Sequence, residues 1–140
     1  MNITKTFLTL GLASMVMQSM AAPVGEAAGV EARKNPLLVQ SKLPYGAPDF
    51  KNIRTSDYLP ALQAGIAEQR RNVEAIVNNA ETPTFQNTIV AFEESGALLE
   101  RVANVFFGLI SADKTPEIAE TEKAAIPLLT ALENELMFNK

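Results

Sequence analysis

The chain has 140 residues, of which 47% are hydrophobic and 20% are charged, a composition typical of one globular domain. The formal net charge of −4, with no run of more than two basic residues, argues against nucleic acid as a partner. The chain contains no cysteine and no histidine. These absences exclude disulfides, thiolate zinc sites, an H-E-x-x-H zinc helix and a Ser-His-Asp triad built from this chain alone.

Residues 1–21 have the pattern of a secretory signal peptide. Lys5 supplies a positive start, residues 7–17 are apolar, and Ser19-Met20-Ala21 places small residues where a signal peptidase requires them. We expect cleavage after Ala21, although a cut after Ala22 is an alternative. Because the apolar run is shorter than the roughly 20 residues of a membrane span, we expect a periplasmic or secreted protein without stable membrane association. The competing interpretation is an ordinary buried helix.

The next two segments are predicted to be irregular. Residues 22–34 are mainly small and polar, which predicts a flexible spacer. Pro36, Pro44 and Pro48 then predict an extended, turning arm over residues 35–54, because each proline removes a backbone donor. The arm carries apolar residues that are expected to anchor it against the fold: Leu37, Leu38, Val39, Leu43, Tyr45 and Phe50.

A first helix is predicted to begin near residues 55–57 and to end at residues 78–83. Thr55, Ser56 and Asp57 are favourable capping residues, and Asp57 also suits the positive end of the helix dipole. Pro60 is compatible with this helix only in the first turn. Apolar residues at helical spacing predict one buried face: Tyr58, Leu59, Leu62, Ile66, Val73, Ile76 and Val77.

A second helix is predicted from the cap Thr84 to about Ala112. Residues 106–110 are apolar nearly all round, which predicts burial on more than one side. Gly96 and Gly108 lower helix propensity, and we expect the close approach of another helix to compensate. Apolar or small residues step by three or four along the whole segment: Phe85, Ile89, Phe92, Gly96, Leu99, Val102, Phe106 and Leu109.

A third helix is predicted to start at Thr115-Pro116-Glu117, where a cap, a first-turn proline and an acid follow one another. Pro127 is expected to kink or break it. Its apolar positions are Ile118, Ala125, Ile126, Leu128, Leu129, Leu132 and Leu136. The predicted fold class is therefore all-α, with antiparallel helices preceded by an extended proline-rich arm.

The chain offers little chemistry of its own. Acidic pairs at residues 93–94, 117/120 and 133/135 could suit calcium or magnesium, but solvated helix surface is the favoured interpretation, as it is for Arg70-Arg71. The phenylalanines 85, 92, 106, 107 and 138 are expected to be core, and the serines have no base to activate them. We therefore identify no catalytic, cofactor-binding or metal-ligating residue.

Several segments nevertheless resemble one known family. They are Asn35-Pro36-Leu37-Leu38, the following Ser41-x-Leu43-Pro44-Tyr45-Gly46-Ala47-Pro48-Asp49-Phe50, Asp57-Tyr58-Leu59-Pro60-Ala61, and above all the run from Pro83 to Val102. In this order they resemble the start of bacterial peptidyl-dipeptidases (dipeptidyl carboxypeptidases) of the M3, thimet-oligopeptidase-like family. The likeness extends over residues 35–140.

The resemblance implies a fold and a function. Family members are large helical zinc peptidases whose two halves enclose a channel, with the H-E-x-x-H helix far along the chain. Residues 35–140 would then be the truncated amino-terminal helical region of an exported enzyme, inactive alone and partnered by its missing carboxyl-terminal region. The full-length enzyme would use zinc to release carboxyl-terminal dipeptides from short peptides.

Three alternatives remain at this stage. The chain could be a non-catalytic periplasmic helical binding or scaffold module that keeps the peptidase's amino-terminal fold. It could be a fragment of an oligopeptidase A-type endopeptidase. It could also be a periplasmic helical hairpin that pairs through its apolar stripe.

Overall fold

The computed structural model describes residues 33–138, and all the regular structure within them is helical. Three long helices dominate: α1 (Thr55–Val77), α3 (Ala97–Ala112) and α4 (Pro116–Met137). Shorter elements are η1 (Pro36–Leu38), η2 (Pro44–Gly46), η3 (Phe85–Val90) and α2 (Ala91–Ser95). The predicted all-α class is thus confirmed. The predicted leader and residues 22–32 of the predicted spacer lie outside the described residues.

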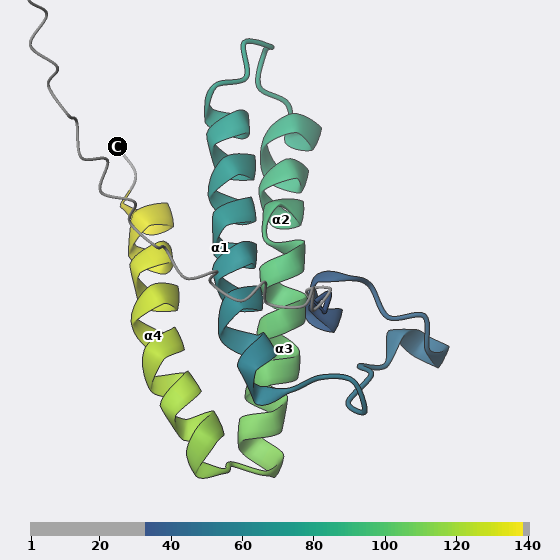
Figure 1. Cartoon of the computed structure of the whole chain (residues 1–140). Coiled ribbons are helices and arrows are strands. Elements are labelled where there is room, and N and C mark those ends of the chain that lie inside the picture. The colour runs from purple at the N-terminus through teal and green to yellow at the C-terminus, as the bar shows by residue number, and fades with distance from the viewer. Residues whose placement is uncertain (1–32, 139–140) are drawn as a thin grey trace, which may run out of the picture. The chain divides into compact units, whose positions relative to one another are not determined.

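The helices form an up-down-up arrangement with α1 in the middle. Figure 1 shows α1 packed against α2 and α3 on one side and against α4 on the other. The loop over residues 78–84 joins α1 to η3, and residues 113–115 join α3 to α4. Because each of these two connections is short, the helices that it joins lie antiparallel in space.

Helix α1 begins where the sequence predicts, but its capping differs in detail. The residue before the helix is Arg54, whose backbone N–H donates to the Asp57 carboxylate at 2.8 Å. Asp57 therefore satisfies the helix start from within its first turn. Pro60 lies in the second turn, not the first as predicted. Its side chain is exposed there, so its ring does not disturb the packed face.

The second predicted helix is not continuous. Residues 85–90 form a π-helical segment, and α2 ends at Ser95 before α3 begins after Gly96. At this interruption the side chain of Gln69 in α1 lies close to Gly96, with its Nε2 2.8 Å from the position of an added Cβ. The predicted close approach of another helix is met at Gly96 by this α1 side chain. At Gly108 the prediction fails within the described residues, because an added Cβ would have no neighbouring heavy atom within 4 Å. The predicted cap Thr84 is confirmed as well: its Oγ1 accepts from the Asn87 N–H at 3.1 Å.

Helix α4 starts at the predicted place and runs unbroken. The Thr115 Oγ1 accepts from the Ile118 N–H at 3.3 Å, as expected of a cap. The helix continues through Pro127 to Met137, so the alternative of a break there was wrong. None of the helices in residues 33–138 combines the length and apolar character that crossing a bilayer needs.

The core lies between the three long helices. Tyr58 and Phe106 are at its centre, with ring centroids 5.2 Å apart. From the arm, η1 contributes Leu37, and the Arg101 guanidinium donates to the Leu37 carbonyl at 3.4 Å. The buried hydrophobic residues are Leu37, Tyr58, Ala61, Leu62, Ile66, Leu99, Val102, Phe106, Ile118, Ala125 and Leu132.

Many apolar residues predicted to be buried are not. In the arm only Leu37 is buried, and Tyr45 projects fully into solvent with a left-handed backbone (φ 59°). Of the five phenylalanines predicted as core, only Phe106 is buried. The reason is that the described helices lie side by side with α1 in the middle. No second layer of described residues covers their outer faces. The exposed large hydrophobic residues include Leu38, Val39, Leu43, Phe50, Val77, Phe85, Ile89, Phe92, Phe107, Ile126 and Phe138.

Candidate functional site

The described residues contain no constellation that could hold a metal. Among residues 33–138, no three or more acidic, histidine or cysteine side chains cluster for that purpose. The acidic pairs at residues 93–94, 117/120 and 133/135 are exposed, as the surface interpretation predicted. Zinc sites in proteins rely on histidine and cysteine, and the sequence has neither. The residues of this chain therefore do not fit the zinc that the resemblance implies.

The most constrained polar group is the carboxylate of Asp57, at the start of α1. The guanidinium of Arg33 donates to its two oxygens at 2.5 and 2.6 Å, and also to the Asn52 carbonyl at 2.8 Å. Asn35 bonds the Asp57 carbonyl at 2.7 Å through its side-chain amide. These contacts tie both ends of the arm to the helix start. We call the Arg33–Asp57 pair the latch.

The latch has an electrostatic signature. Burial of the Asp57 carboxyl group opposes ionisation, but the hydrogen bonds and positive charges of Arg33 and Arg54 outweigh it and lower its pKa. Arg33 lies in the predicted spacer, and its pairing with Asp57 was not predicted from the sequence. No local pattern could have indicated it, because 24 residues separate the partners. The latch is fully paired, so it orders the arm and leaves no free group for chemistry.

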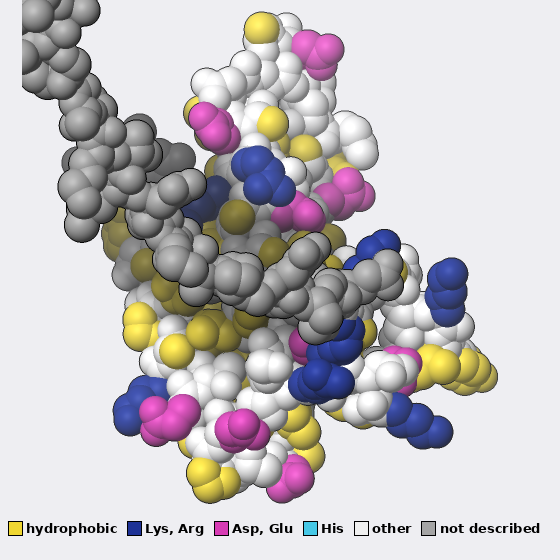
Figure 2. All heavy atoms as spheres, viewed as in Figure 1, with side chains coloured by type: hydrophobic (Ala, Val, Ile, Leu, Met, Phe, Trp, Pro, Cys, Tyr) yellow, Lys and Arg dark blue, Asp and Glu magenta, His cyan; other side chains and the backbone are white. Residues whose placement is uncertain are grey.

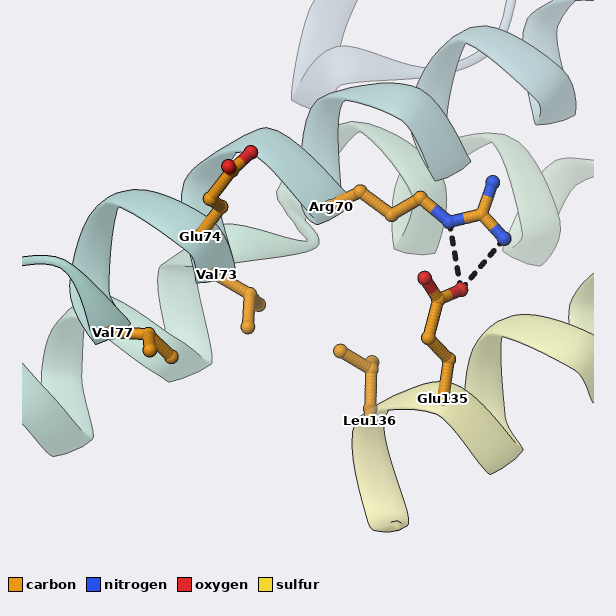
Figure 3. A pocket seen from close by; sticks show the side chains of 6 residues that line it. All are labelled: Arg70, Val73, Glu74, Val77, Glu135 and Leu136. Atoms are coloured by element: carbon orange, nitrogen blue, oxygen red, sulfur yellow. Dashed lines mark hydrogen bonds and ion pairs between the residues drawn. The ribbon is translucent and has the colours of Figure 1, made fainter. Parts of the chain in front are cut away.

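A groove opens between α1 and the end of α4, with a volume of about 310 Å³. Figure 3 shows Arg70 of α1 reaching across it to Glu135 of α4, with Nε and a terminal nitrogen 2.8 and 2.7 Å from one carboxylate oxygen. Both side chains are about half exposed. Val73, Val77 and Leu136 line the rest, together with Glu74. Its basic group is already paired, so the groove holds no free cation for an anionic ligand.

A second groove is almost wholly apolar. It runs between the arm and the outer face of α3 and has a volume of about 530 Å³. We call it the α3 groove. The Asn104 side chain is its one polar lining group, and Gly108 lies midway along it. The lining residues are Pro48, Phe50, Asn104, Val105, Gly108, Leu109 and Ala112.

Apolar side chains are exposed elsewhere too. In the space-filling view of Figure 2, hydrophobic side chains lie among charged ones on the α1–α2 hairpin, on α4 and on the arm. Phe85 is 72% exposed, Ile89 50% and Phe92 44%, and they follow one another at helical spacing. Exposed apolar surface of this kind is typical of sites that contact another polypeptide, a membrane or a ligand.

One buried polar atom has no partner within the described part of the chain, the hydroxyl of Tyr58. The residue is 1% exposed and packs on Phe106. Burial, with the negative charge of nearby Asp57, raises the pKa of the phenol. A neutral phenol held this way in an apolar core is unsuited to acid–base work near neutral pH.

Comparison with known proteins places these features in context. The chain is 45% identical over 105 residues to the dipeptidyl carboxypeptidase of Salmonella typhimurium and 41% identical over 105 residues to that of Escherichia coli. It is 29% identical over 96 residues to the oligopeptidase A of Escherichia coli. No family model matches the chain.

Each match covers most of this chain but only a small part of the relative. The two dipeptidyl carboxypeptidase matches cover 75% of this chain but only 15% of each relative. The oligopeptidase A match covers 69% of this chain and 14% of the relative. The chain thus spans a small part of the length of the curated relatives that it matches.

Proposed function

Because the chain is homologous to dipeptidyl carboxypeptidases of the M3 family, we propose that it forms the amino-terminal helical part of an exported enzyme of this kind. The observation that carries the proposal is 45% identity over 105 of the 140 residues. The higher identity to the dipeptidyl carboxypeptidases than to oligopeptidase A favours the peptidyl-dipeptidase branch.

In this role the chain supplies scaffold and no chemistry. Its residues do not fit a zinc site, so we assign the metal, and with it every step of hydrolysis, to the rest of the enzyme. The three helices would contribute to the wall of the peptide channel, and their exposed apolar side chains would pack against that larger body. The substrates of the whole enzyme would be short peptides that lose a carboxyl-terminal dipeptide.

A chimaeric enzyme tests the proposal. The stretch of the Salmonella enzyme that matches this chain is replaced by residues 35–140 of this chain, and dipeptide release from a blocked tripeptide is measured with added zinc. We expect turnover by the chimaera. The control is the same enzyme with a Gly/Ser linker of equal length in that place, which we expect to be inactive. A soluble chimaera as inactive as the linker control would overturn the proposal.

The isolated chain provides the complementary measurement. With zinc and the same tripeptide, the pure 140-residue protein should show no turnover, because it has no histidine to bind the metal. Turnover would contradict a purely scaffolding role. A soluble but inactive chimaera together with an inactive chain would instead favour the binding-module alternative.

Export is part of the proposal and has its own test. The apolar run over residues 7–17 followed by Ser19-Met20-Ala21 supports a cleaved leader. Produced with a carboxyl-terminal tag in Escherichia coli, the chain should appear in the periplasmic fraction with Ala22 as its first residue. An intact Met1 in the cytoplasmic fraction would overturn this part.

A further inference from the structure

Two glycines in the long helices have opposite surroundings. In α1, a Cβ added to Gly65 would lie 2.8 Å from the Leu99 Cα, so the backbones of α1 and α3 meet at this glycine. In α3, a Cβ added to Gly108 would have no heavy atom within 4 Å among the described residues. One glycine therefore serves a helix crossing that is present, and the other lies open.

The surroundings of Gly108 resemble one side of a helix crossing. The row of residues at a spacing of four along α3 consists of Asn104, Gly108 and Ala112, and it is low at Gly108 and Ala112 because their side chains are small. Val105 and Leu109 lie beside that row, and Phe50 of the arm, 57% exposed, lines the same groove. A low row between apolar ridges is the shape into which the ridge of another helix fits.

The chemistry of the α3 groove restricts its occupant. No charged side chain lines it, and its one polar lining side chain is the Asn104 amide. A phosphate, a carboxylate or a charged peptide would find no partner there, whereas an apolar side chain would remove both surfaces from water. The matched relatives place about 85% of their length outside the region that corresponds to this chain, which provides ample polypeptide to cover it.

We propose that the α3 groove receives an apolar helix from the remaining part of a dipeptidyl carboxypeptidase-type enzyme, crossing α3 at Gly108. This inference rests on the proposed function and gives it a specific contact. The residues that hold the helix are Gly108, which allows close approach, and Phe50, which lines the groove. The arm therefore serves as one wall of an interface, with the latch fixing it in place.

The test compares the melting temperature of the isolated 140-residue chain with that of the chimaera. In the isolated chain, Gly108→Ala should raise the melting temperature by about 4–8 °C, because it removes the helix penalty of glycine where space is open. Gly108→Leu should raise it as well. In the chimaera both should lower it, Leu more than Ala, because the added side chain enters the space of the docked helix. The sign of the shift thus reverses between the two proteins.

Two further variants sharpen the result. Phe50→Ala should leave the isolated chain nearly unchanged, since Phe50 is outside its core, and should lower the melting temperature of the chimaera. Ala131→Leu on α4 is the matched control: Ala131 is exposed and lines none of the grooves described above, so its shift should have the same sign in both proteins.

The outcomes separate the two proposals. An active chimaera that Gly108→Leu stabilises would leave the proposed function standing and overturn the docking inference. If Ala131→Leu lowered the melting temperature of the chimaera as much as Gly108→Leu does, the docking inference would also be overturned, because the effect would not be specific to the groove. An inactive, unfolded chimaera would overturn both. An isolated chain that sediments as a dimer, and becomes monomeric with Gly108→Leu, would make a second copy the occupant and overturn the inference.

Discussion

The apolar stripe that runs from Phe85 to Phe106 is buried in one region of the molecule and exposed in another. In the helical body (residues 55–72 and 97–137), Leu99, Val102 and Phe106 of α3 lie buried in the core that packs against α1. In the hairpin tip (residues 73–92), Phe85 and Ile89 continue the stripe, yet no residue of this range is buried. Helical periodicity therefore predicts which residues share a face. Whether that face is covered depends on the elements that pack against it, which local periodicity does not reveal.

The comparison is sharpest for two phenylalanines of the stripe. Phe106 is fully buried, and its truncation to alanine should cost about 3–5 kcal/mol of unfolding free energy, from lost burial and a new cavity. Phe85→Ala should cost less than about 0.5 kcal/mol because the ring is 72% exposed. Urea unfolding of the full chain checks both. Similar costs would show that the hairpin tip is packed, and the comparison would fail.

The close crossing of α1 and α3 provides the next test. Gly65→Ala places a Cβ 2.8 Å from the Leu99 Cα, a backbone atom that cannot move away alone. We expect the free energy of unfolding, measured with urea, to fall by about 1–3 kcal/mol. Gly108→Ala in the same isolated chain is the control and should gain up to about 1 kcal/mol. A neutral Gly65→Ala would mean that the two helices are farther apart than described.

The latch should contribute less to the free energy of unfolding than the core residues do. Asp57→Asn keeps the shape of the side chain but removes the charge that binds Arg33 and receives the Arg54 N–H, so we expect a loss of about 1–2 kcal/mol. Arg33→Gln should reproduce part of this loss. Equal stability of wild type and Asp57→Asn in thermal unfolding at pH 7 would show that the arm is not held by this pair.

The latch also predicts a pH dependence. The folded-state pKa of Asp57 is lowered below its unfolded value of about 3.9, so its contribution is present above about pH 4 and is lost as the pH falls through the folded-state value. The stability difference between wild type and Asp57→Asn should therefore be constant from pH 5 to pH 7, to the nearest few tenths of a kcal/mol, and shrink in acid. A difference that grows on acidification would contradict this assignment.

A smaller effect, of opposite sign, is expected at the centre of the core. Tyr58→Phe removes a buried hydroxyl that has no partner within residues 33–138. We therefore expect the free energy of unfolding to rise by about 1 kcal/mol. Tyr58→Leu, which removes the ring packed on Phe106, should destabilise instead. A loss with Tyr58→Phe in urea unfolding would reveal a hydrogen bond to the hydroxyl.

The smallest effect belongs to the Arg70–Glu135 pair of Figure 3. Both side chains are about half exposed, so the coupling energy from a double-mutant cycle with alanine should be below about 1 kcal/mol and should fall with added salt. A larger, salt-insensitive coupling would mean that the pair helps to hold α4 against α1.

The helix starts were predictable because their signals are local. Thr84 and Thr115 cap helices as expected, and α1 begins at Thr55. The contact between Gly96 and Gln69 was not predictable, because Gln69 lies 27 residues earlier in the sequence. The latch was missed for the same reason. No catalytic residue was expected from the sequence, and the functional hypothesis came from the resemblance over residues 35–140, since exposed apolar surface has no motif of its own.

The helical character of the described residues has a consequence for folding kinetics. The described residues are mostly helical, so most of their close contacts lie near one another in sequence, and chains rich in such local contacts fold in microseconds to milliseconds. Protein synthesis adds only about 5–20 residues per second. We therefore expect the helical unit, once released in a solvent where it can fold, to be complete long before a polypeptide several times its length could assemble around it.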